Sequence, residues 1–410
     1  MTATPPDPPV ALPIVARITP PIARPITTRP GFGLRWRTLA RVALRMMFHD
    51  KLKMIGTLAG VIFAVLLSNQ QAGTFLGLIY KNTMFVANSD ADIWIAPPGT
   101  EAFQPGKPIP ESYILQARVV EGVEWAEPLL YGASTIALPS GGAEAVTLVG
   151  TRAPALHGGP WNVVVGDPQS LGSPDMMFFE HADREKFGGL NLGTVRELGG
   201  KKVIVSGFTW GLLPFGPSYA FGEYNLIQQI LRVPPDQTSF GLVGVRPGHD
   251  PVQVAADLQA QLPDTKILTR DQYRSSIIRY LLTRTAIGIT FGTSALFGLI
   301  IGFVIVALAM FSAVLDNVRE FGTLKAIGAT NRDLARLLAV QAVVYALLGS
   351  LIGLSLVTFV ASKIRSPTLA MILPGELLIG TTIVMILMCI VASGLALLRL
   401  RKVEPGMVFR

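Results

Sequence analysis

The sequence has little charge, one cysteine and few histidines. Charged residues make up 15% of its 410 residues, against roughly a quarter in soluble domains. The single cysteine, Cys389, excludes an intrachain disulfide. The four histidines are scattered, and none has a partner at metal-ligand spacing: His49, His157, His181 and His249. These features predict neither a disulfide-bonded fold nor a metal site.

Catalytic signatures are also missing. The sequence contains no G-x-S-x-G, H-E-x-x-H or paired-cysteine motif. "GGKK" at Gly199 lacks the spacing and the hydroxyl residue of a Walker A sequence, so we expect neither a bound cofactor nor nucleotide hydrolysis by this chain. We interpret the cluster Glu180, His181, Asp183 and Glu185 as a solvated loop in preference to a metal or acid/base site. A membrane-anchored enzyme is therefore the least favoured class.

Long uncharged stretches are abundant, and the mean hydropathy is +0.47. Thr285–Leu315, Leu337–Ser362 and Leu377–Leu398 carry no charge over 31, 26 and 22 residues, and about 20 suffice to cross a bilayer. Met54–Tyr80 is a fourth candidate, interrupted by Ser68, Asn69, Gln70 and Gln71. The last two either pair across a dimer or lie in a stalk. We predict an α-helical membrane protein with four transmembrane helices and an α/β extracytoplasmic domain inserted between helices 1 and 2.

The predicted segments follow from these stretches. They are a disordered Pro-rich tail (1–32), an amphipathic interfacial helix (33–53), the first span (54–80), the α/β domain (81–284), the second span (285–315), a cytoplasmic loop (316–336), the third span (337–362), an outer loop (363–376), the fourth span (377–398) and a tail (399–410). Residues 33–53 place Leu34, Leu39, Val42, Ala43, Met46 and Met47 on one helical face. The alternative is a charge cluster that only sets topology.

Lysine and arginine are concentrated in three short segments. Residues 1–53 hold nine of them against two acids, 316–336 four against three, and the tail from Arg399 four against one. The positive-inside rule places both termini and the 316–336 loop in the cytoplasm of an inner-membrane protein. Segment 81–284 is then outside, with 16 basic and 20 acidic residues. The net charge of +8 indicates topology and contact with anionic membrane lipids, because no nucleic-acid motif accompanies it.

Alternating apolar residues predict strands in the outer segment at Ala91–Pro97 and Lys201–Gly207, and a hairpin from Ser134–Pro139 to Ala145–Thr151. Ser239–Thr269 predicts a strand, helix and strand. Helical periodicity is predicted for Glu111–Val123 and for Asp271–Arg284, with the latter running into the second span without a break. These patterns indicate a mixed α/β fold.

Arg319–Thr330, "REFGTLKAIGAT", lies between two spans. Val318, Phe321, Leu324 and Leu334 indicate helical pieces, which Gly322 and Gly328 weaken. Thr330 or Asn331 can cap the next helix, with Asp333 near its positive end. A short helix, a turn and a re-entry are predicted. The apolar side chains of this loop are covered either by a partner, or by the chain's own bundle or the lipid surface.

Glycines at four-residue spacing mark two spans. The pairs are Gly288 and Gly292, Gly298 and Gly302, and Gly349 and Gly353. Such spacing favours close helix packing, although membrane helices also contain glycine without this role.

The loop resembles the signature of the MacB/FtsX-like permease family, an arginine followed by E-x-G-x-L-x-A-x-G-A. The matching residues are Arg319, Glu320, Gly322, Leu324, Ala326, Gly328 and Ala329. The tail "RKVEPGMVF" and the layout of one span, a large domain and three spans are similar to the family as well. The layout most resembles stand-alone permeases of the DevC type.

The resemblance implies a permease subunit of a type VII ABC transporter, in which ATP is bound by a separate cytoplasmic ATPase subunit. The coupling residues would be Arg319, Glu320, Phe321, Gly322, Leu324, Lys325, Ala326, Ile327, Gly328 and Ala329. A permease homodimer and a periplasmic adaptor are the other partners it implies. Export or extraction of a lipid, haem-like or other small substrate is the expected function. The alternative is an FtsX-like signalling or scaffold protein that regulates a cell-envelope partner without transport.

Overall fold

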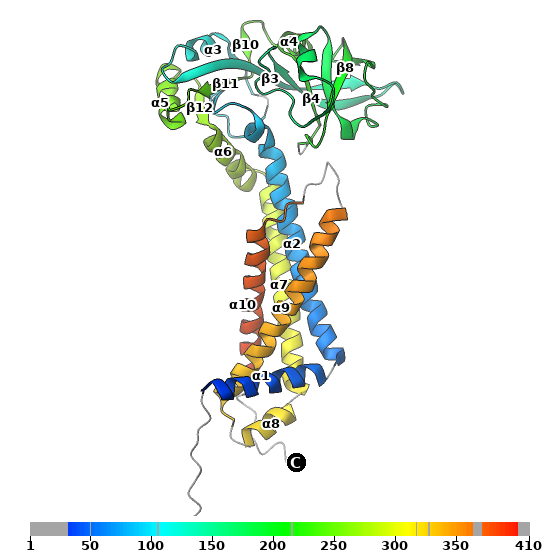
Figure 1. The fold of residues 1–410 in the computed structure, drawn as a ribbon, viewed down its shortest axis with the longest axis vertical. Coiled ribbons are helices and arrows are strands. Elements are labelled where there is room, and N and C mark those ends of the chain that lie inside the picture. The colour runs from blue at the N-terminus through cyan, green and yellow to red at the C-terminus, as the bar shows by residue number, and fades with distance from the viewer. Residues whose placement is uncertain are drawn as a thin grey trace, which may run out of the picture.

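The computed structural model describes residues 32–49, 51–104, 106–214, 216–316, 318–326, 329–363 and 371–400. These residues form an elongated molecule with an α/β domain at one end of a helical bundle (Figure 1). Residues 1–31 of the predicted Pro-rich tail, residues 364–370 of the loop 363–376 and residues 401–410 of the C-terminal tail lie outside the described residues.

Four helices form the bundle: α2 (Lys51–Asn88), α7 (Ala286–Asp316), α9 (Asn331–Lys363) and α10 (Gly375–Leu400). Within the described residues, each contains a segment long and apolar enough to cross a membrane, so the four predicted spans correspond to four candidate membrane helices. With 38 residues, α2 is about 57 Å long at about 1.5 Å per residue. Because a hydrocarbon core is about 30 Å thick, α2 projects beyond the bundle into the α/β domain.

The predicted continuous helix from Asp271 into the second span is wrong. Helix α6 (Arg270–Thr283) ends before α7 begins at Ala286. Its last turn is closed by the Thr285 hydroxyl, which donates to the Leu281 carbonyl at 2.7 Å. A Cβ added at Gly288 would lie 2.6 Å from the Leu281 oxygen. The bend therefore brings α7 against the end of α6 at a distance that glycine accommodates.

The domain between α2 and α7 contains one large mixed sheet. In the described residues its order is β12-β1-β11-β3-β4-β9-β6-β8-β5, with β7 beside β3 and β8. The strands are β1 (Ile93–Ala96), β3 (Val123–Ala137), β4 (Ala143–Thr151), β5 (Val163–Val165), β6 (Met176–Glu180), β7 (Val195–Leu198), β8 (Lys201–Thr209), β9 (Tyr219–Glu223), β11 (Phe240–Val245) and β12 (Lys266–Thr269). The 15-residue strand β3 pairs with β11 along its first half and with β4 along its second half, so it joins the two halves of the sheet.

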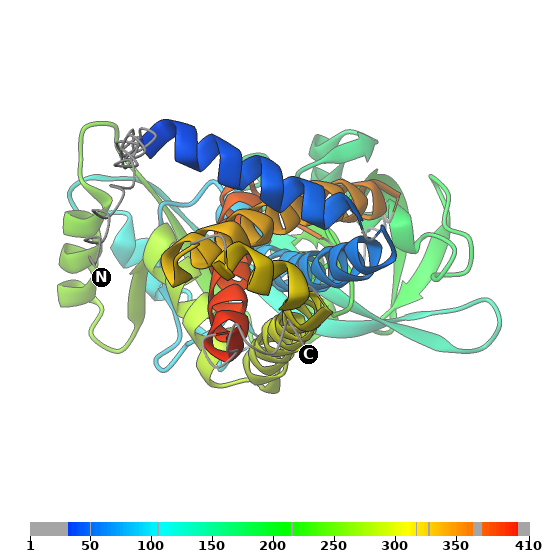
Figure 2. The ribbon, with the colours of Figure 1, turned by 90° about the horizontal axis from the view of Figure 1, so that it is seen from below.

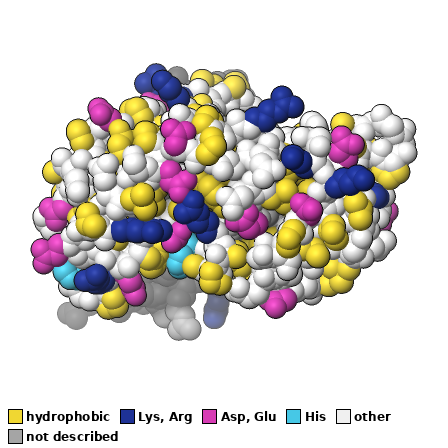
Figure 3. Space-filling model, turned by 90° about the horizontal axis from the view of Figure 1, so that it is seen from above, with side chains coloured by type: hydrophobic (Ala, Val, Ile, Leu, Met, Phe, Trp, Pro, Cys, Tyr) yellow, Lys and Arg dark blue, Asp and Glu magenta, His cyan; other side chains and the backbone are white. Residues whose placement is uncertain are grey.

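Short elements complete the domain. They are β2 (Ile109–Pro110), paired with β10 (Gln237–Thr238), the helices α3 (Ser112–Ala117), α4 (Tyr224–Leu231) and α5 (Pro251–Gln261), and 3-10 turns at Pro168–Gly172 and His181–Asp183. The predicted hairpin is confirmed as β3–β4. The helix predicted over Glu111–Val123 is only six residues long, and Val123 begins β3. Seen from above, the domain surface has interspersed basic and acidic side chains (Figure 3).

An aromatic cluster joins the α/β domain to the helices beneath it. Phe85, in the last turns of α2, is fully buried, and its ring lies 4.7–6.4 Å from five other aromatic rings: Trp94, Phe103, Tyr131, Trp161 and Tyr219. Tyr273, Ile277 and Leu281 of α6 belong to the same buried core. Both helices that enter the domain are thus held in one packed cluster.

Glu180 does not lie in a solvated loop, as the sequence suggested, because its side chain is fully buried. Its carboxylate accepts hydrogen bonds from the backbone N–H groups of Gly211 at 2.8 Å and Leu212 at 2.9 Å, and from the Thr209 hydroxyl at 3.2 Å. Burial raises the pKa of the Glu180 carboxyl, and these donors oppose that shift. Glu180 therefore organises the turn that follows β8.

Replacing Glu180 with alanine should destabilise the α/β domain by about 1–3 kcal/mol, because buried backbone N–H groups at Gly211 and Leu212 lose their acceptor. The free energy of unfolding is measured by urea titration, with protease resistance as the probe of the folded fraction. Glu185→Ala removes an exposed carboxylate five residues away and should change stability by less than about 0.5 kcal/mol. Equal stabilities for the two variants would contradict the assigned role.

Candidate functional site

The predicted loop lies at the end of the bundle far from the α/β domain. There α1 (Phe32–His49) lies across the bundle, and α8 (Val318–Ala326) is a short helix between α7 and α9 (Figures 1 and 2). Ile327 and Gly328 are outside the described residues, as are the side chains of Arg319, Lys325 and Ala326. The described backbone on either side of residues 327–328 agrees with the predicted short helix and the predicted return into the bundle.

Phe321 anchors α8 to the chain's own bundle. Its side chain is 1% exposed, and Gly322 beside it is also buried. The apolar cluster that covers Phe321 combines α1, α7 and α9 through Ala43, Val314, Leu334, Leu337 and Leu338. Leu324 packs at the edge of the same cluster. Of the two alternatives for this side chain, packing within the chain is the one observed, so Phe321 does not offer its ring to a partner.

The opposite face of α8 is exposed at Glu320 and Thr323. These residues are three positions apart and so share one face of the helix. The Thr323 hydroxyl donates to the Glu320 carbonyl at 2.8 Å. After the helix, the Ala329 N–H donates to the Leu324 carbonyl at 2.9 Å. Helix α8 is therefore packed against the bundle on one face and exposed on the other.

Thr330 caps the next helix. The Asp333 N–H donates to the Thr330 hydroxyl oxygen at 3.3 Å, and the Thr330 N–H donates to the Asp333 carboxylate at 3.1 Å. This reciprocal pair is a capping box. It selects Thr330 over Asn331 as the cap and fixes where α9 begins.

Helix α1 is an amphipathic helix, as predicted, but it ends at His49 and not at residue 53, because residues 51–53 belong to α2. Part of its apolar face packs against protein. Ala43 and Met47 are buried. The Gln341 side-chain amide of α9 donates to the Ala43 carbonyl at 3.1 Å. Contact with the bundle, in addition to any contact with lipid, therefore holds α1 in place.

Three of the predicted packing glycines lie where helices approach closely. A Cβ at Gly302 would be 2.7 Å from the Ala64 Cβ, and one at Gly353 would be 2.9 Å from Val65 Cγ1. Gly349 lies similarly tight against Val61. Gly302 thus brings α7 close to α2, while Gly349 and Gly353 bring α9 close to α2.

The other three predicted glycines differ. A Cβ added at Gly298 would make only an ordinary contact, 3.6 Å from Leu67, and one added at Gly292 would meet no other described segment within 4 Å. Gly288 serves the bend described above. Sequence reasoning missed Gly60, which lies against Ile305 of α7. Its spacing from Ala64 is a small-xxx-small pair and could have identified it.

Asn69 is the buried member of the polar group in α2. Its amide donates to the Val65 carbonyl at 2.8 Å, and its oxygen accepts from the Thr381 hydroxyl of α10 at 3.3 Å. Gln70 is exposed and Gln71 is half-buried. The polar interruption therefore includes a link between two spans.

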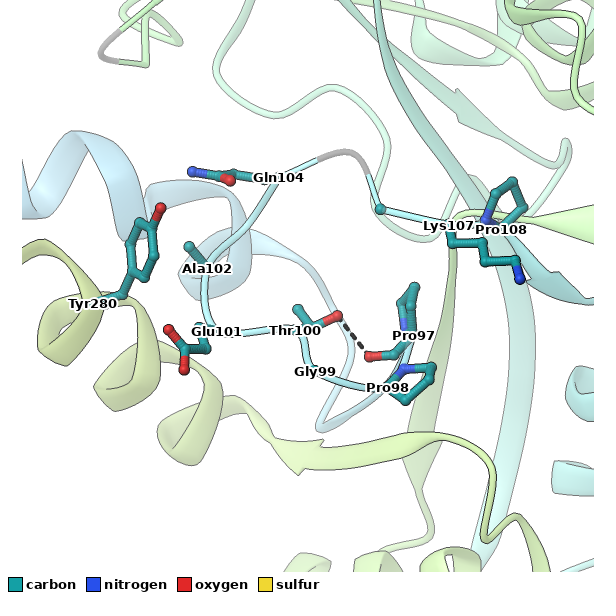
Figure 4. Close-up of a pocket in the computed structure, with 11 residues that line it drawn as sticks. Pro97, Pro98, Gly99, Thr100, Glu101, Ala102, Gln104, Lys107, Pro108 and Tyr280 are labelled. Atoms are coloured by element: carbon teal, nitrogen blue, oxygen red, sulfur yellow. Dashed lines mark hydrogen bonds between the residues drawn. The ribbon is translucent and has the colours of Figure 1, made fainter. Parts of the chain in front are cut away.

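A hollow of about 360 Å³ lies beside α6 on the α/β domain. The backbone from Pro97 to Pro108, whose residue 105 is outside the described residues, surrounds it together with Tyr280 (Figure 4). The Thr100 hydroxyl donates to the Pro97 carbonyl at 2.7 Å. Glu101 lies toward α6 and Lys107 on the other side, so their charges do not converge (Figure 4). The hydrogen bond stabilises the backbone around the hollow, but the lining does not form an acid/base pair.

Comparison with known proteins identifies part of the chain. Residues 272–405 match the family described as FtsX-like permease C-terminal. Among solved structures, the chain is similar to the extracellular domain of the noncanonic ABC-type transporter YknZ from Gram-positive bacteria, with 17% identity and a TM-score of 0.33 over 44% of this chain and 98% of that one. It is also similar to the periplasmic region of MacB from Actinobacillus actinomycetemcomitans, with 10% identity and a TM-score of 0.36 over 46% of this chain and 94% of that one.

No curated protein matches the chain. The family match begins in α6 and includes α7, α8, α9 and α10, so it contains the loop on which the predicted resemblance was based. That resemblance is confirmed. The chain is a multi-pass membrane protein whose residues 272–405 match the family described as FtsX-like permease C-terminal.

Proposed function

We propose that this chain is the permease subunit of an ABC transporter, driven by a separate ATPase subunit that docks on the exposed face of α8. The α8 end and both termini are assigned to the cytoplasm, and the α/β domain to the outer side of the inner membrane. A homodimer of the chain would export or extract a lipid, haem-like or other small substrate, with an adaptor protein able to join on the outer side. The family match and the position of α8 support this assignment.

The anchoring of Phe321 is the observation that carries the proposal. Its ring is enclosed by residues of α1, α7 and α9. Close-packed side chains transmit displacement because they leave little free volume to absorb it. A push on the exposed face of α8 would therefore move these helices together.

Further contacts extend this route to the α/β domain. Gly302 and Gly353 hold α7 and α9 against α2. Helix α2 ends in the aromatic cluster around Phe85, which also includes Tyr273 of α6. A movement begun at α8 would reach the α/β domain through α2 and α6. This route needs no charged pathway between the spans.

Charge reversal at Glu320 tests the docking face. Glu320→Arg should reduce copurification of the ATPase subunit at least about tenfold, because an exposed contact of about 1.4 kcal/mol or more is replaced by repulsion. The variant should insert normally, since Glu320 is exposed and lies outside the Phe321 cluster. Copurification from membranes and the ATPase rate of the complex measure the result.

Glu124→Arg is the matched control, an equal charge reversal at an exposed position of the α/β domain. It should leave both copurification and ATPase activity unchanged. Normal ATPase binding by the Glu320 variant, or an equal loss in the control, would remove the support for α8 as the docking element.

A further inference from the structure

A basic pocket lies where α6 approaches the bundle. It has a volume of about 310 Å³ and is lined by Glu101, Lys266, Ser276, Arg279, Tyr280, Thr283 and Arg284. Three of these residues are basic and one is acidic, which leaves a net charge of +2. The last turns of α6 form one wall, and the Glu101 region forms another.

The positive charge in this pocket is only partly balanced. The Arg284 Nε atom lies 3.9 Å from the Glu101 carboxylate, beyond hydrogen-bonding distance. Lys266 donates to the Thr100 carbonyl, which carries no net charge. Within the described residues, the Arg279 side chain has no hydrogen-bond or ion-pair partner. By contrast, Arg270 on the same helix is 3.3 Å from the Asp92 carboxylate.

The pocket is also next to a membrane-spanning segment. Arg284 is two residues before Ala286, where the candidate span Ala286–Leu308 begins. Leu282 is 45% exposed and Ile289 is 65% exposed, so apolar surface flanks the basic residues. Segment 81–284 as a whole is acidic, with 20 acidic and 16 basic residues. The basic pocket is thus a local exception within this segment, and it lies next to the start of a candidate span.

We propose that this pocket binds the headgroup of an anionic phospholipid from the adjacent leaflet. Arg279 and Arg284 would contact the phosphate, since guanidinium groups donate several hydrogen bonds to phosphate oxygens. The acyl chains would lie along the exposed apolar surface of Leu282 and Ile289. A net charge of +2 favours a headgroup with net negative charge over a zwitterionic one. Such a lipid would hold the α6–α7 bend at the membrane surface.

Lipid binding to the purified full chain tests the proposal without the ATPase subunit, so its outcome is independent of the proposed function. Short-chain phosphatidylglycerol is added in an uncharged detergent, and native mass spectrometry measures lipid-bound against free chain. Short-chain phosphatidylcholine serves as the zwitterionic reference. We expect phosphatidylglycerol to bind preferentially, and Arg279→Gln with Arg284→Gln to weaken that binding roughly tenfold or more through the loss of charge-assisted hydrogen bonds.

Arg246→Gln with Arg274→Gln is the matched control, because both arginines are exposed and outside the pocket. It should bind phosphatidylglycerol like the unmodified chain. Inorganic phosphate in excess should not displace the lipid, since it lacks acyl chains. The proposal is overturned if the Arg279 and Arg284 variant binds like the unmodified chain, if the control loses as much binding, or if phosphate displaces the lipid and the pocket is a free-anion site.

Discussion

Phe321→Ala should abolish coupling between the ATPase subunit and the permease. The substitution removes a side chain that is 1% exposed from the cluster joining α1, α7, α8 and α9. Truncation of a buried phenylalanine costs about 3–5 kcal/mol, more than a nine-residue helix gains from its own hydrogen bonds, because isolated short helices are marginal in water. α8 should therefore detach from the bundle and leave the ATPase subunit without a fixed docking surface.

Cysteine labelling measures the detachment. Leu334→Cys places a thiol at a position that is 1% exposed, and the native Cys389 is buried. A water-soluble maleimide should label position 334 in the Phe321→Ala background and not in the parent. The ATPase rate of the complex should fall to that of the isolated ATPase subunit.

Phe321→Leu is the control for side-chain volume. It keeps an apolar group in the cluster and should retain most of the coupling, because similar-sized apolar replacements typically cost less than about 1.5 kcal/mol. If Phe321→Ala leaves labelling at position 334 and ATPase coupling as they are in the parent, the cluster does not anchor α8.

Phe85→Ala should uncouple the α/β domain from α2 while leaving the ATPase subunit bound. Phe85 is fully buried, and five aromatic rings lie within 6.4 Å of its ring. Its truncation should cost about 3–5 kcal/mol in the domain core and open a cavity where α2 meets the sheet. Limited trypsin digestion of intact membranes should cut the α/β domain at a lower temperature than in the parent.

ATPase copurification should be unchanged by Phe85→Ala, because α8 is at the other end of the bundle (Figure 1). Phe63→Ala is the matched control on the same helix, where the side chain is 50% exposed. It should alter neither trypsin sensitivity nor ATPase binding. A Phe85→Ala variant that melts like this control would show that the aromatic cluster does not hold α2 in the domain.

The sequence predicted the features that depend on short stretches of chain. Four uncharged stretches identify four candidate spans, because crossing a hydrocarbon core requires about 20 apolar residues wherever they occur. The sequence also narrowed the cap of α9 to Thr330 or Asn331. Such a cap can be recognised locally, because the capping box involves only Thr330 and Asp333, three residues apart. The loop between Arg319 and Thr330 indicated the resemblance to FtsX-like permeases for the same reason, since its residues are contiguous, and it lies within the matched residues 272–405.

Burial and close approach required the three-dimensional structure, because they depend on contacts between segments far apart in the chain. Phe321 was expected either to meet a partner or to pack on the bundle, and Ala43 and Leu334 cover it. Glu180 looked solvated from its charged neighbours, yet the backbone at Gly211 and Leu212 encloses it. Local sequence gives the propensity of each helix and strand, whereas the exposure of a side chain depends on which distant segment packs over it.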